Sequence, residues 1–383
     1  MNQNILLTGG RMTATLALAR LFSAAGYRVF VVDSFKNFIC SYSRATVKGF
    51  VVPSPRYDTS NYIKALQSII QKEKIGLLIP TSEEIFYLSS YLEELEPLCT
   101  VFAASLPNLR QLYNKWTFIQ TAKTLGLLVP KTWLIKSRQD LASCLRMATP
   151  SQLILKPVYS RLGRNIHLFN QPVERLPKLE IEEKQPWVLQ EFIPGQEYTT
   201  YSVAQQGELK AHVTHLRSSS LSPVDSWSEL VAVKETKILN WVVDFVKAKQ
   251  FTGQIAFNFI VDEYDDIYPV GCNLQLTKAI HLFHHQDGLT EAFLNTDEDV
   301  IQPQKQLKIT SSLATIHKGL FPKIIPQKLK QGGQTLTQTQ DEVFRLSDPL
   351  PAYVFFKGYL NSNDTEFFAQ DLEWDGEEIT KKN

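Results

Sequence analysis

The chain has 383 residues, which is long enough for two or three domains with sizeable cores. Hydrophobic residues make up 44% of it and aromatic residues 11%, and this composition excludes an intrinsically disordered protein. The formal net charge is +1, so no overall electric field favours nucleic acid or an anionic membrane as a partner.

Cysteine usage and hydropathy indicate the compartment. The four cysteines, Cys40, Cys99, Cys144 and Cys272, are widely spaced and form no C-x-x-C pair, which disfavours a structural zinc site and a disulfide framework. The apolar run at residues 5–8 is too short for a signal peptide, and no run approaches the roughly 18 apolar residues of a membrane-spanning helix. We therefore expect a protein of the reducing cytoplasm.

Strands and helices alternate over residues 1–112. Strands are predicted near residues 5–8, 28–33, 75–79 and 100–103, and helices near residues 12–25, 61–74 and 83–95. This alternation predicts a parallel sheet with helices on both faces. The Gly9-Gly10 turn lacks the full G-x-G-x-x-G pattern, so we expect a tight turn and no dinucleotide there. Because that pattern is absent, Asp33 is a weak candidate for a ribose ligand.

Acidic residues follow one of these strands in the segment 80–84. Ligands of open α/β sheets bind at the carboxyl ends of the strands, so Glu83 and Glu84 are candidates for binding a substrate. The alternative is a helix N-terminus, capped by Ser82 or Thr81, where two acids are favourable to the helix dipole.

Two lysines are candidates for binding phosphate. Lys115 opens a predicted helix, and Lys156 stands at the end of the apolar strand 153–157. A lysine buried at such a place is costly unless it meets an anion, although an ordinary strand-end lysine is the alternative. The next loop can direct backbone N–H groups at phosphates. The residues that it would use are Ser160, Arg161 and Gly163.

The segment 187–198 contains the pattern E-x-x-x-G-x-E between two predicted strands, with Glu191, Gly195 and Glu197 at its fixed positions. An extended backbone offers the donor and acceptor that a purine edge needs, and a carboxylate can accept from two vicinal hydroxyls. The alternative to a nucleotide site is an ordinary strand, a Pro-Gly turn and a second strand, with Glu197 exposed to solvent.

A β-hairpin is predicted at residues 254–273, with an acidic turn at residues 263–266. Its first strand contains Asn258. Its second strand leads into the sequence Gly271-Cys272-Asn273-Leu274-Gln275.

The order and spacing of these features resemble the ATP-grasp ligases over about residues 3–300. Asn273 is the residue retained from their E-x-N-P-R motif. The resemblance implies a mixed α/β and α+β architecture in three parts. A Rossmann-like pre-ATP-grasp domain at residues 1–112 would precede a two-subdomain ATP-grasp domain at residues 113–320, with the lid at about 130–190 and the hinge at 190–197. A C-terminal extension at residues 321–383 would pack on the ATP-grasp body, and residues 349–359 are expected to form a strand.

The resemblance also implies roles for individual residues. Lys115, Lys156 and the loop after it would bind the phosphates of ATP, and Glu197 would bind the ribose. Adenine would lie against the hinge, formed by Gln190, Glu191, Phe192 and Ile193. Asn258 and Asn273 stand at the positions of the magnesium ligands. Arg217 would meet the γ-phosphate or an acyl phosphate, or else it is a solvated strand end.

His281 follows the second strand of the hairpin, and its spacing to His285 is i, i+4. On a helix that spacing could bind a metal, but no third ligand is evident. We therefore expect His281 to line the substrate end of the site.

Two functions follow from the resemblance. One is an ATP-dependent carboxylate–amine ligase, whose partners are ATP, a small carboxylate and an amine, and for which a homodimer is one allowed state. The other is a catalytically inactive relative that binds nucleotide or a partner. The metal position decides between them, because Asn258 is neutral, Gly271 offers no ligand and Gln275 has no guanidinium group. Magnesium-dependent turnover is therefore expected to be weakened.

Overall fold

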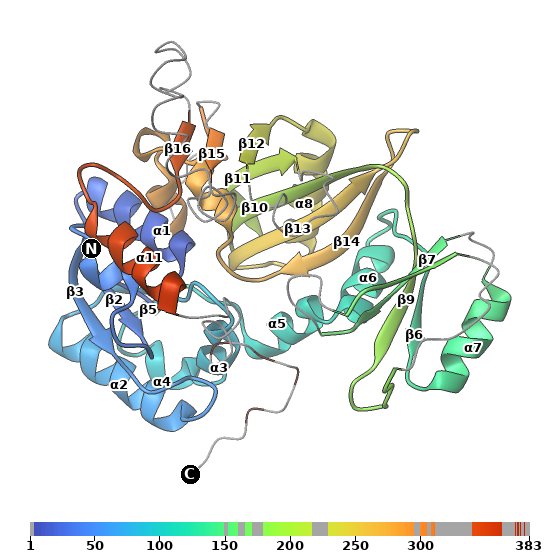
Figure 1. Cartoon of the computed structure of the whole chain (residues 1–383), viewed down its shortest axis with the longest axis horizontal. Helices are drawn as coiled ribbons and strands as arrows, with labels where there is room; N and C mark the ends of the chain where they lie inside the picture. Colours follow the sequence, from blue (N-terminus) through green and yellow to red (C-terminus); the bar gives the residue numbers. More distant parts are fainter. Residues whose placement is uncertain are drawn as a thin grey trace.

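The computed structural model describes residues 4–148, 152–159, 165–170, 179–216, 229–294, 299–304, 308–310 and 339–361, together with residues 372, 374, 376 and 379. Across these residues the strands assemble into three sheets (Figure 1). None of the helices in these ranges is long and apolar enough to cross a membrane.

The first sheet is parallel, with the strand order β3-β2-β1-β4-β5. Its strands are β1 (Asn4–Leu7), β2 (Arg28–Asp33), β3 (Thr46–Val51), β4 (Leu77–Ile79) and β5 (Thr100–Val101). Successive residues of β1 enter different cores, since Ile5 packs with the core around helix α1 (Thr13–Ala24) and Leu6 with the core around α2 (Thr59–Lys72). The predicted parallel sheet with helices on both faces is therefore confirmed.

Two local features of this region differ from the prediction. Strand β3 was not predicted, because its residues are half-buried or exposed and include Lys48 and Gly49, which weaken a strand pattern. The helix predicted at residues 83–95 is divided into α3 (Glu84–Ser89) and α4 (Leu92–Leu95). Tyr91 separates the two, with a φ of −123° outside the helical region.

The second sheet has the strand order β14-β13-β10-β11-β12-β15-β16. Its strands are β10 (Gln196–Gln205), β11 (Glu208–Leu216), β12 (Glu229–Val233), β13 (Gly253–Val261), β14 (Ile267–Asn273), β15 (Lys308–Thr310) and β16 (Thr339–Asp341). Helix α8 (Thr236–Ala248) packs its stripe of Ile238, Trp241, Val242 and Phe245 into the same core as Phe257. The stripe is therefore core, as its helical spacing predicts.

The third sheet is smaller and antiparallel, with the order β6-β9-β7-β8. Its strands are β6 (Thr132–Ile135), β7 (Gln152–Pro157), β8 (His167–Asn170) and β9 (Trp187–Glu191), and α7 (Arg138–Met147) lies within its span. It covers the residues expected for the lid. Helices α5 (Leu106–Tyr113) and α6 (Lys115–Thr124) connect it in sequence to the first sheet.

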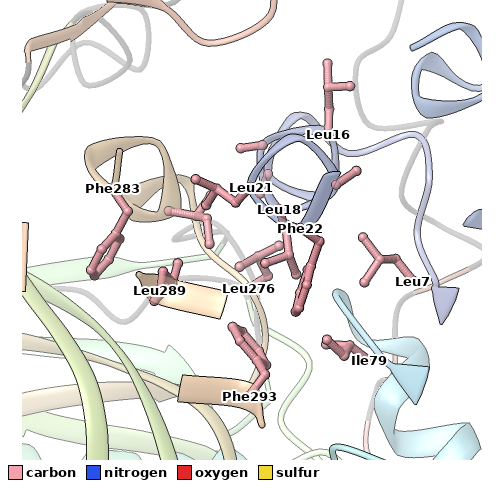
Figure 2. Close-up of a cluster of buried hydrophobic side chains, with 14 of the residues drawn as sticks. Leu7, Leu16, Leu18, Leu21, Phe22, Ile79, Leu276, Phe283, Leu289 and Phe293 are labelled. Atoms are coloured by element: carbon pink, nitrogen blue, oxygen red, sulfur yellow. The ribbon is translucent and has the colours of Figure 1, made fainter. Parts of the chain in front are cut away.

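A single hydrophobic core joins the first sheet to the segment that follows β14. Figure 2 shows Leu18, Leu21 and Phe22 of α1 beside Leu276 and Phe293 from that segment. Phe22 and Phe293 have ring centroids 5.7 Å apart. The carboxyl ends of the first sheet are thereby fixed against the end of the hairpin β13–β14.

The strand expected at residues 349–359 is wrong, because these residues belong to helix α11 (Leu350–Asn361). The run of Tyr353, Val354, Phe355 and Phe356 favours a strand by residue type. Tertiary contacts override that preference, since the last three of these side chains pack against the core around α1. Pro351 lies in the first turn of the helix, where proline costs no hydrogen bond.

A buried ion pair ties the C-terminal residues to α1. Arg20 donates from Nη2 to Asp348 Oδ2 over 2.9 Å and to the Val343 carbonyl over 3.0 Å. Asp348 also accepts from the Ser43 hydroxyl and from the Arg44 backbone N–H. Burial alone would raise the pKa of Asp348, but these hydrogen bonds outweigh it, and the pKa lies below its ordinary value. Because β16 also extends the second sheet, residues 339–361 contact both halves of the molecule.

We expect Asp348→Asn to lower the free energy of unfolding by about 3 kcal/mol, because Arg20 would stay buried without its counter-charge. Chemical denaturation followed by circular dichroism measures this loss. Glu183→Gln is the control, because Glu183 pairs with Lys136 at the surface with its side chain 80% exposed, and it should cost less than about 1 kcal/mol. Equal effects of the two substitutions would contradict a special role for the buried pair.

Candidate functional site

The Lys156 ammonium group is the centre of the site. It lies on β7, and the residue is only 8% exposed. Its Nζ donates to Gln190 Oε1 over 2.9 Å and to the Val270 carbonyl of β14 over 2.9 Å. Gln190 is itself oriented by a hydrogen bond from Nε2 to Thr132 Oγ1. The predicted hinge residue Gln190 thus positions the lysine, and Lys156 joins the third sheet to the second.

Lys115 approaches Lys156 from the start of α6. Asn114 caps this helix by accepting at Oδ1 from two backbone N–H groups, those of Trp116 and Thr117. The backbone N–H and the Nζ of Lys115 both donate to the Val158 carbonyl, each over 3.3 Å. The cap and these bonds fix the start of the Lys115 side chain at Val158, the first residue after the strand that contains Lys156.

The two ammonium groups are close enough to perturb one another. Burial, and to a smaller extent the positive charge of Lys115, together lower the pKa of Lys156 from 10.5 to about 7. Burial also lowers the pKa of Lys115, to about 8, although the Glu83 carboxylate opposes this shift. The two lysines, which the sequence indicates as phosphate ligands, therefore converge near β14. Two lysines beside a single carboxylate leave a surplus of positive charge, which suits an anionic ligand.

The hinge offers a backbone donor. The N–H groups of Glu191 and Phe192 are bonded to the carbonyls of Lys131 and Gln152. In contrast, the backbone N–H of Ile193 has no partner among the residues that the structure describes. Ile193 is therefore able to donate to a ligand, as a purine edge requires.

Gly195 is required by a close approach of the hinge to β13. A Cβ at this position would lie 2.2 Å from the Val261 carbonyl oxygen, so a larger residue would push the two strands apart. The Glu197 side chain follows at the start of β10 and is exposed. Steric exclusion of a Cβ thus explains the glycine of the E-x-x-x-G-x-E pattern. The roles of Glu191, Phe192 and Glu197 in binding a nucleotide stay predictions.

The expected metal position contains amides and no carboxylate. In the β13–β14 pair Asn258 is opposite Gly271, and Ala256 is opposite Asn273, so both asparagines lie on one face of the sheet. Asn258 Oδ1 already accepts from Thr199 Oγ1 over 3.1 Å. In the described ranges no three His, Cys, Asp or Glu residues are grouped to hold a metal ion. These donors do not fit a magnesium ion held by the protein.

The acidic turn does not supply the missing ligands. Asp262 accepts at Oδ1 from the backbone N–H groups of Tyr264 and Asp266. Asp265 is exposed and pairs with Lys237. The sequence places these acids at the hairpin tip and predicts that they face solvent; this is confirmed for Glu263, Asp265 and Asp266, which are exposed, while Asp262 is half-buried.

Glu83 and Glu84 have different environments despite being adjacent. Glu84 Oε1 accepts from the Thr8 hydroxyl and from the backbone N–H groups of Thr81 and Ser82, which joins the ends of β1 and β4. Burial raises the pKa of Glu84. These bonds favour the interpretation of Glu84 as part of a helix N-terminus, but the expected cap is wrong, because Glu83 and neither Ser82 nor Thr81 is the N-cap residue and no side chain caps the helix.

Glu83 is buried on the side of Lys115. Its Oε1 accepts from the Tyr113 hydroxyl over 3.0 Å, and its Oε2 accepts from the Trp374 backbone N–H over 2.9 Å. The sequence did not indicate Tyr113 or Trp374 as members of the site. Neither residue belongs to a sequence motif, because one is a Tyr at a helix end and the other is an isolated Trp near the C-terminus. Only the fold brings them to the site.

Asp33 and His281 are both buried. Asp33 binds Arg11, whose Nε donates to Oδ1 over 2.9 Å. His281 is buried in the 3-10 helix η3 (Lys278–Leu282), while His285 is exposed in a separate 3-10 helix η4 (His285–Asp287). The i, i+4 metal alternative therefore lacks the continuous helix that it needs. Burial lowers the pKa of His281 to about 3, so its imidazole is neutral.

Four predicted residues lie outside the described part of the chain. They are Ser160, Arg161, Gly163 and Arg217. Their roles stay predictions.

A parallel-sheet domain followed by two sheets that hold a lysine pair at their junction defines the ATP-grasp fold, and the chain has this fold. No model of a known sequence family and no curated protein matches the chain. Solved structures match at low sequence identity, which shows the fold alone.

Three of these structures illustrate the match. The purK N5-carboxyaminoimidazole ribonucleotide synthetase, solved with ADP, has a TM-score of 0.66 and 14% identity, covering 85% of this chain and 85% of that chain. Biotin carboxylase from Campylobacter jejuni has a TM-score of 0.59 and 12% identity, covering 77% and 72%. L-amino acid ligase from Bacillus licheniformis has a TM-score of 0.57 and 15% identity, covering 73% and 68%.

The pKa of Lys156 predicts how stability depends on pH. Because the folded pKa is about 7 and the ordinary value is 10.5, the unfolded chain binds more protons between these values, and stability rises with pH there. We expect Lys156→Met to reduce this rise by up to about 1.4 kcal/mol per pH unit, measured by urea unfolding of the ligand-free protein from about pH 7 to pH 8.5. The exposed Lys123→Met is the control. Parallel curves for wild type and Lys156→Met would contradict the buried charge.

Proposed function

We propose that the protein binds ATP at the junction of the second and third sheets. The observation that carries this proposal is the buried Lys156 ammonium group, held by two neutral acceptors and placed beside Lys115. An anionic phosphate would supply the missing counter-charge. Solved structures of the same fold that contain ADP or ATP add support.

Within this proposal each group has a physical task. Lys115 and Lys156 neutralise phosphate oxygens, and the backbone N–H of Ile193 donates to the purine edge. Glu197, at the start of β10, accepts from the ribose hydroxyls. Asn258 and Asn273 offer only neutral oxygens near the phosphates, so no step is assigned to a bound magnesium ion.

We further propose a ligase reaction of weakened efficiency for this site. In such a reaction a carboxylate oxygen attacks the γ-phosphorus and ADP leaves, giving an acyl phosphate. An amine nitrogen then attacks the acyl carbon, the carbon–oxygen bond to phosphate breaks, and the amine loses a proton. The lysine pair stabilises the charge on the transferred phosphoryl group. Arg217 and His281 are candidates for contacts to the reacting groups.

A catalytically inactive nucleotide-binding protein is the second candidate. It is favoured by Gly271, which stands opposite Asn258 without any side chain, and by the engagement of Asn258 with Thr199. We also propose the division into residues 1–112, 113–320 and 321–383, a cytoplasmic location, and carboxylate and amine partners for the active form.

ATP titration with magnesium and with a chelator tests the binding site. We expect the dissociation constant to differ by less than about threefold between the two conditions, because the positions facing each other on β13 and β14 offer Asn258 and Gly271 and no carboxylate for the ion. Lys156→Met should weaken binding by about ten- to a hundredfold, since it removes a charged hydrogen-bond donor. Isothermal titration calorimetry measures both, with Lys123→Met as the control. Unchanged affinity in Lys156→Met would contradict the proposed site.

A second experiment restores the missing ligand. A Cβ at Gly271 would meet only the Asn258 side-chain nitrogen, at 3.3 Å, so a longer side chain has room. We expect Gly271→Glu combined with Gln275→Arg to make ATP binding at least about fivefold tighter with magnesium than without it. Gly271→Gln with Gln275→Arg has the same shape without the charge and should show no such gain. Equal metal dependence in both pairs would show that this strand is not the metal position.

A further inference from the structure

Thr132, Gln190 and Lys156 form a row of side chains across one face of the third sheet. Thr132 of β6 is directly opposite Gln190 of β9, and Gln190 is opposite Ile154 of β7, which precedes Lys156 on the same face. Side chains at opposite and diagonal positions on one face of an antiparallel sheet are within reach of each other. The register of the strands therefore makes these three residues neighbours.

Three hydrogen bonds connect the row to the backbone. Lys156 Nζ donates to Gln190 Oε1, and Gln190 Nε2 donates to Thr132 Oγ1, each over 2.9 Å. The Thr132 hydroxyl donates in turn to the Pro130 carbonyl, over 2.9 Å. Gln190 is only 2% exposed, so water has little access to replace its partners. We call this chain of hydrogen bonds from Lys156 to Pro130 the Thr132 relay.

The two ends of the Thr132 relay fix the direction of every bond in it. A carbonyl oxygen only accepts, and an ammonium group only donates. Because the Thr132 hydroxyl gives its proton to Pro130, it offers Gln190 a lone pair, and the amide turns its N–H group towards Thr132. The amide oxygen is then left facing Lys156. A reversed amide would direct its N–H group at a buried cation, which offers no acceptor.

The orientation of this amide acts on the charge of Lys156. The pKa of Lys156 is about 7, because burial and the charge of Lys115 both oppose protonation. Among the described residues, the charged neighbour that acts on Lys156 is Lys115 of α6, and Glu83 acts in turn on Lys115. The oxygens of Gln190 and of the Val270 carbonyl favour the charged form. Because this pKa is close to neutral pH, loss of one of these acceptors would leave the lysine mostly uncharged.

We propose that Thr132 is a positioning residue, which acts through Gln190 to keep an oxygen against the Lys156 ammonium group and so keeps that group charged for a phosphate. This proposal rests on the proposed function, because the phosphate belongs to the same nucleotide. Thr132 itself is assigned no contact with the nucleotide. Its effect passes through the direction of one amide group, so it depends on the hydroxyl of the side chain and not on its volume.

Two substitutions at Thr132 separate the hydroxyl from the shape of the side chain. Thr132→Val keeps the branched shape and removes the hydroxyl, while Thr132→Ser keeps the hydroxyl. Thr59→Val is the matched control, because the Thr59 hydroxyl also donates to a proline carbonyl, that of Pro55, at the start of α2. NMR of protein that contains isotope-labelled lysine measures the pKa of Lys156, whose signal is identified by its absence in Lys156→Met.

We expect Thr132→Val to lower the pKa of Lys156 by about one pH unit, because the amide no longer holds its oxygen towards the ammonium group. ATP binding, measured by calorimetry, should then weaken by about eightfold at about pH 7.5, where fewer variant molecules carry the charge. At about pH 5.5 it should weaken by less than about twofold, because Lys156 is mostly charged in both chains. Thr132→Ser and Thr59→Val should resemble wild type in both measurements.

Gln190→Met gives a second test, because it removes the amide through which Thr132 acts. In a chain with Gln190→Met, adding Thr132→Val should cause no further shift of the Lys156 pKa. An unchanged pKa in Thr132→Val, equal weakening of ATP binding at both pH values, or the same effect from Thr132→Ser would overturn the role of Thr132. A lowered pKa in Thr132→Val, with no ATP binding by wild type, would support the relay and count against the proposed function instead.

Discussion

The buried ammonium group of Lys156 is the interaction on which the rest of the site depends. It joins β7 to β14 through the Val270 carbonyl and to β9 through Gln190, so it links the third sheet to the second. A charge in this position is unfavourable for the ligand-free protein, as its lowered pKa shows. Among the described residues, its hydrogen-bond acceptors are both neutral. Neutral acceptors leave the positive charge available to an anion, whereas a carboxylate partner would neutralise it.

The metal-poor hairpin changes the electrostatics of the same region. In a site that holds magnesium, the negative charge of the acids on the strands and the positive charge of the ion would roughly cancel. The charge of the lysines would then act on the phosphates and on nothing else. With Asn258 and Gly271 on β13 and β14, neither the acids nor the ion is provided for, so the lysines alone are left to balance a nucleotide. Binding can survive this loss more easily than turnover, because ground-state neutralisation needs charge, while transfer also needs a fixed orientation of the γ-phosphate.

The sequence predicted the arrangement of the sheets well, and the lysine pair within it. Alternating strands and helices, the Lys156 strand and the hairpin around Asn258 each leave a periodic local pattern that survives folding. The failures have a tertiary origin. Strand β3 is half-exposed and contains Lys48 and Gly49, so its sequence pattern is weak. The apolar residues of α11 favour a strand by residue type, but their packing against the core around α1 stabilises a helix. Likewise, nothing local distinguishes Glu83 from Glu84, since their different partners come from α5 and from strand ends β1 and β4.

Glu83 shows how the three sheets are made to share one site. It follows β4 of the first sheet, it is buried, and it influences Lys115, whose own backbone is bonded to Val158 after β7. A change that moves the first sheet would therefore alter the charge balance at the lysines without touching either of them. The common core of α1 with Leu276 and Phe293 resists such movement, because its side chains are almost fully buried and interior packing transmits displacement. Hydrogen bonds from the Tyr113 hydroxyl and the Trp374 backbone N–H hold the Glu83 carboxylate on its other side, so residues far apart in the sequence together fix the charge that faces Lys115.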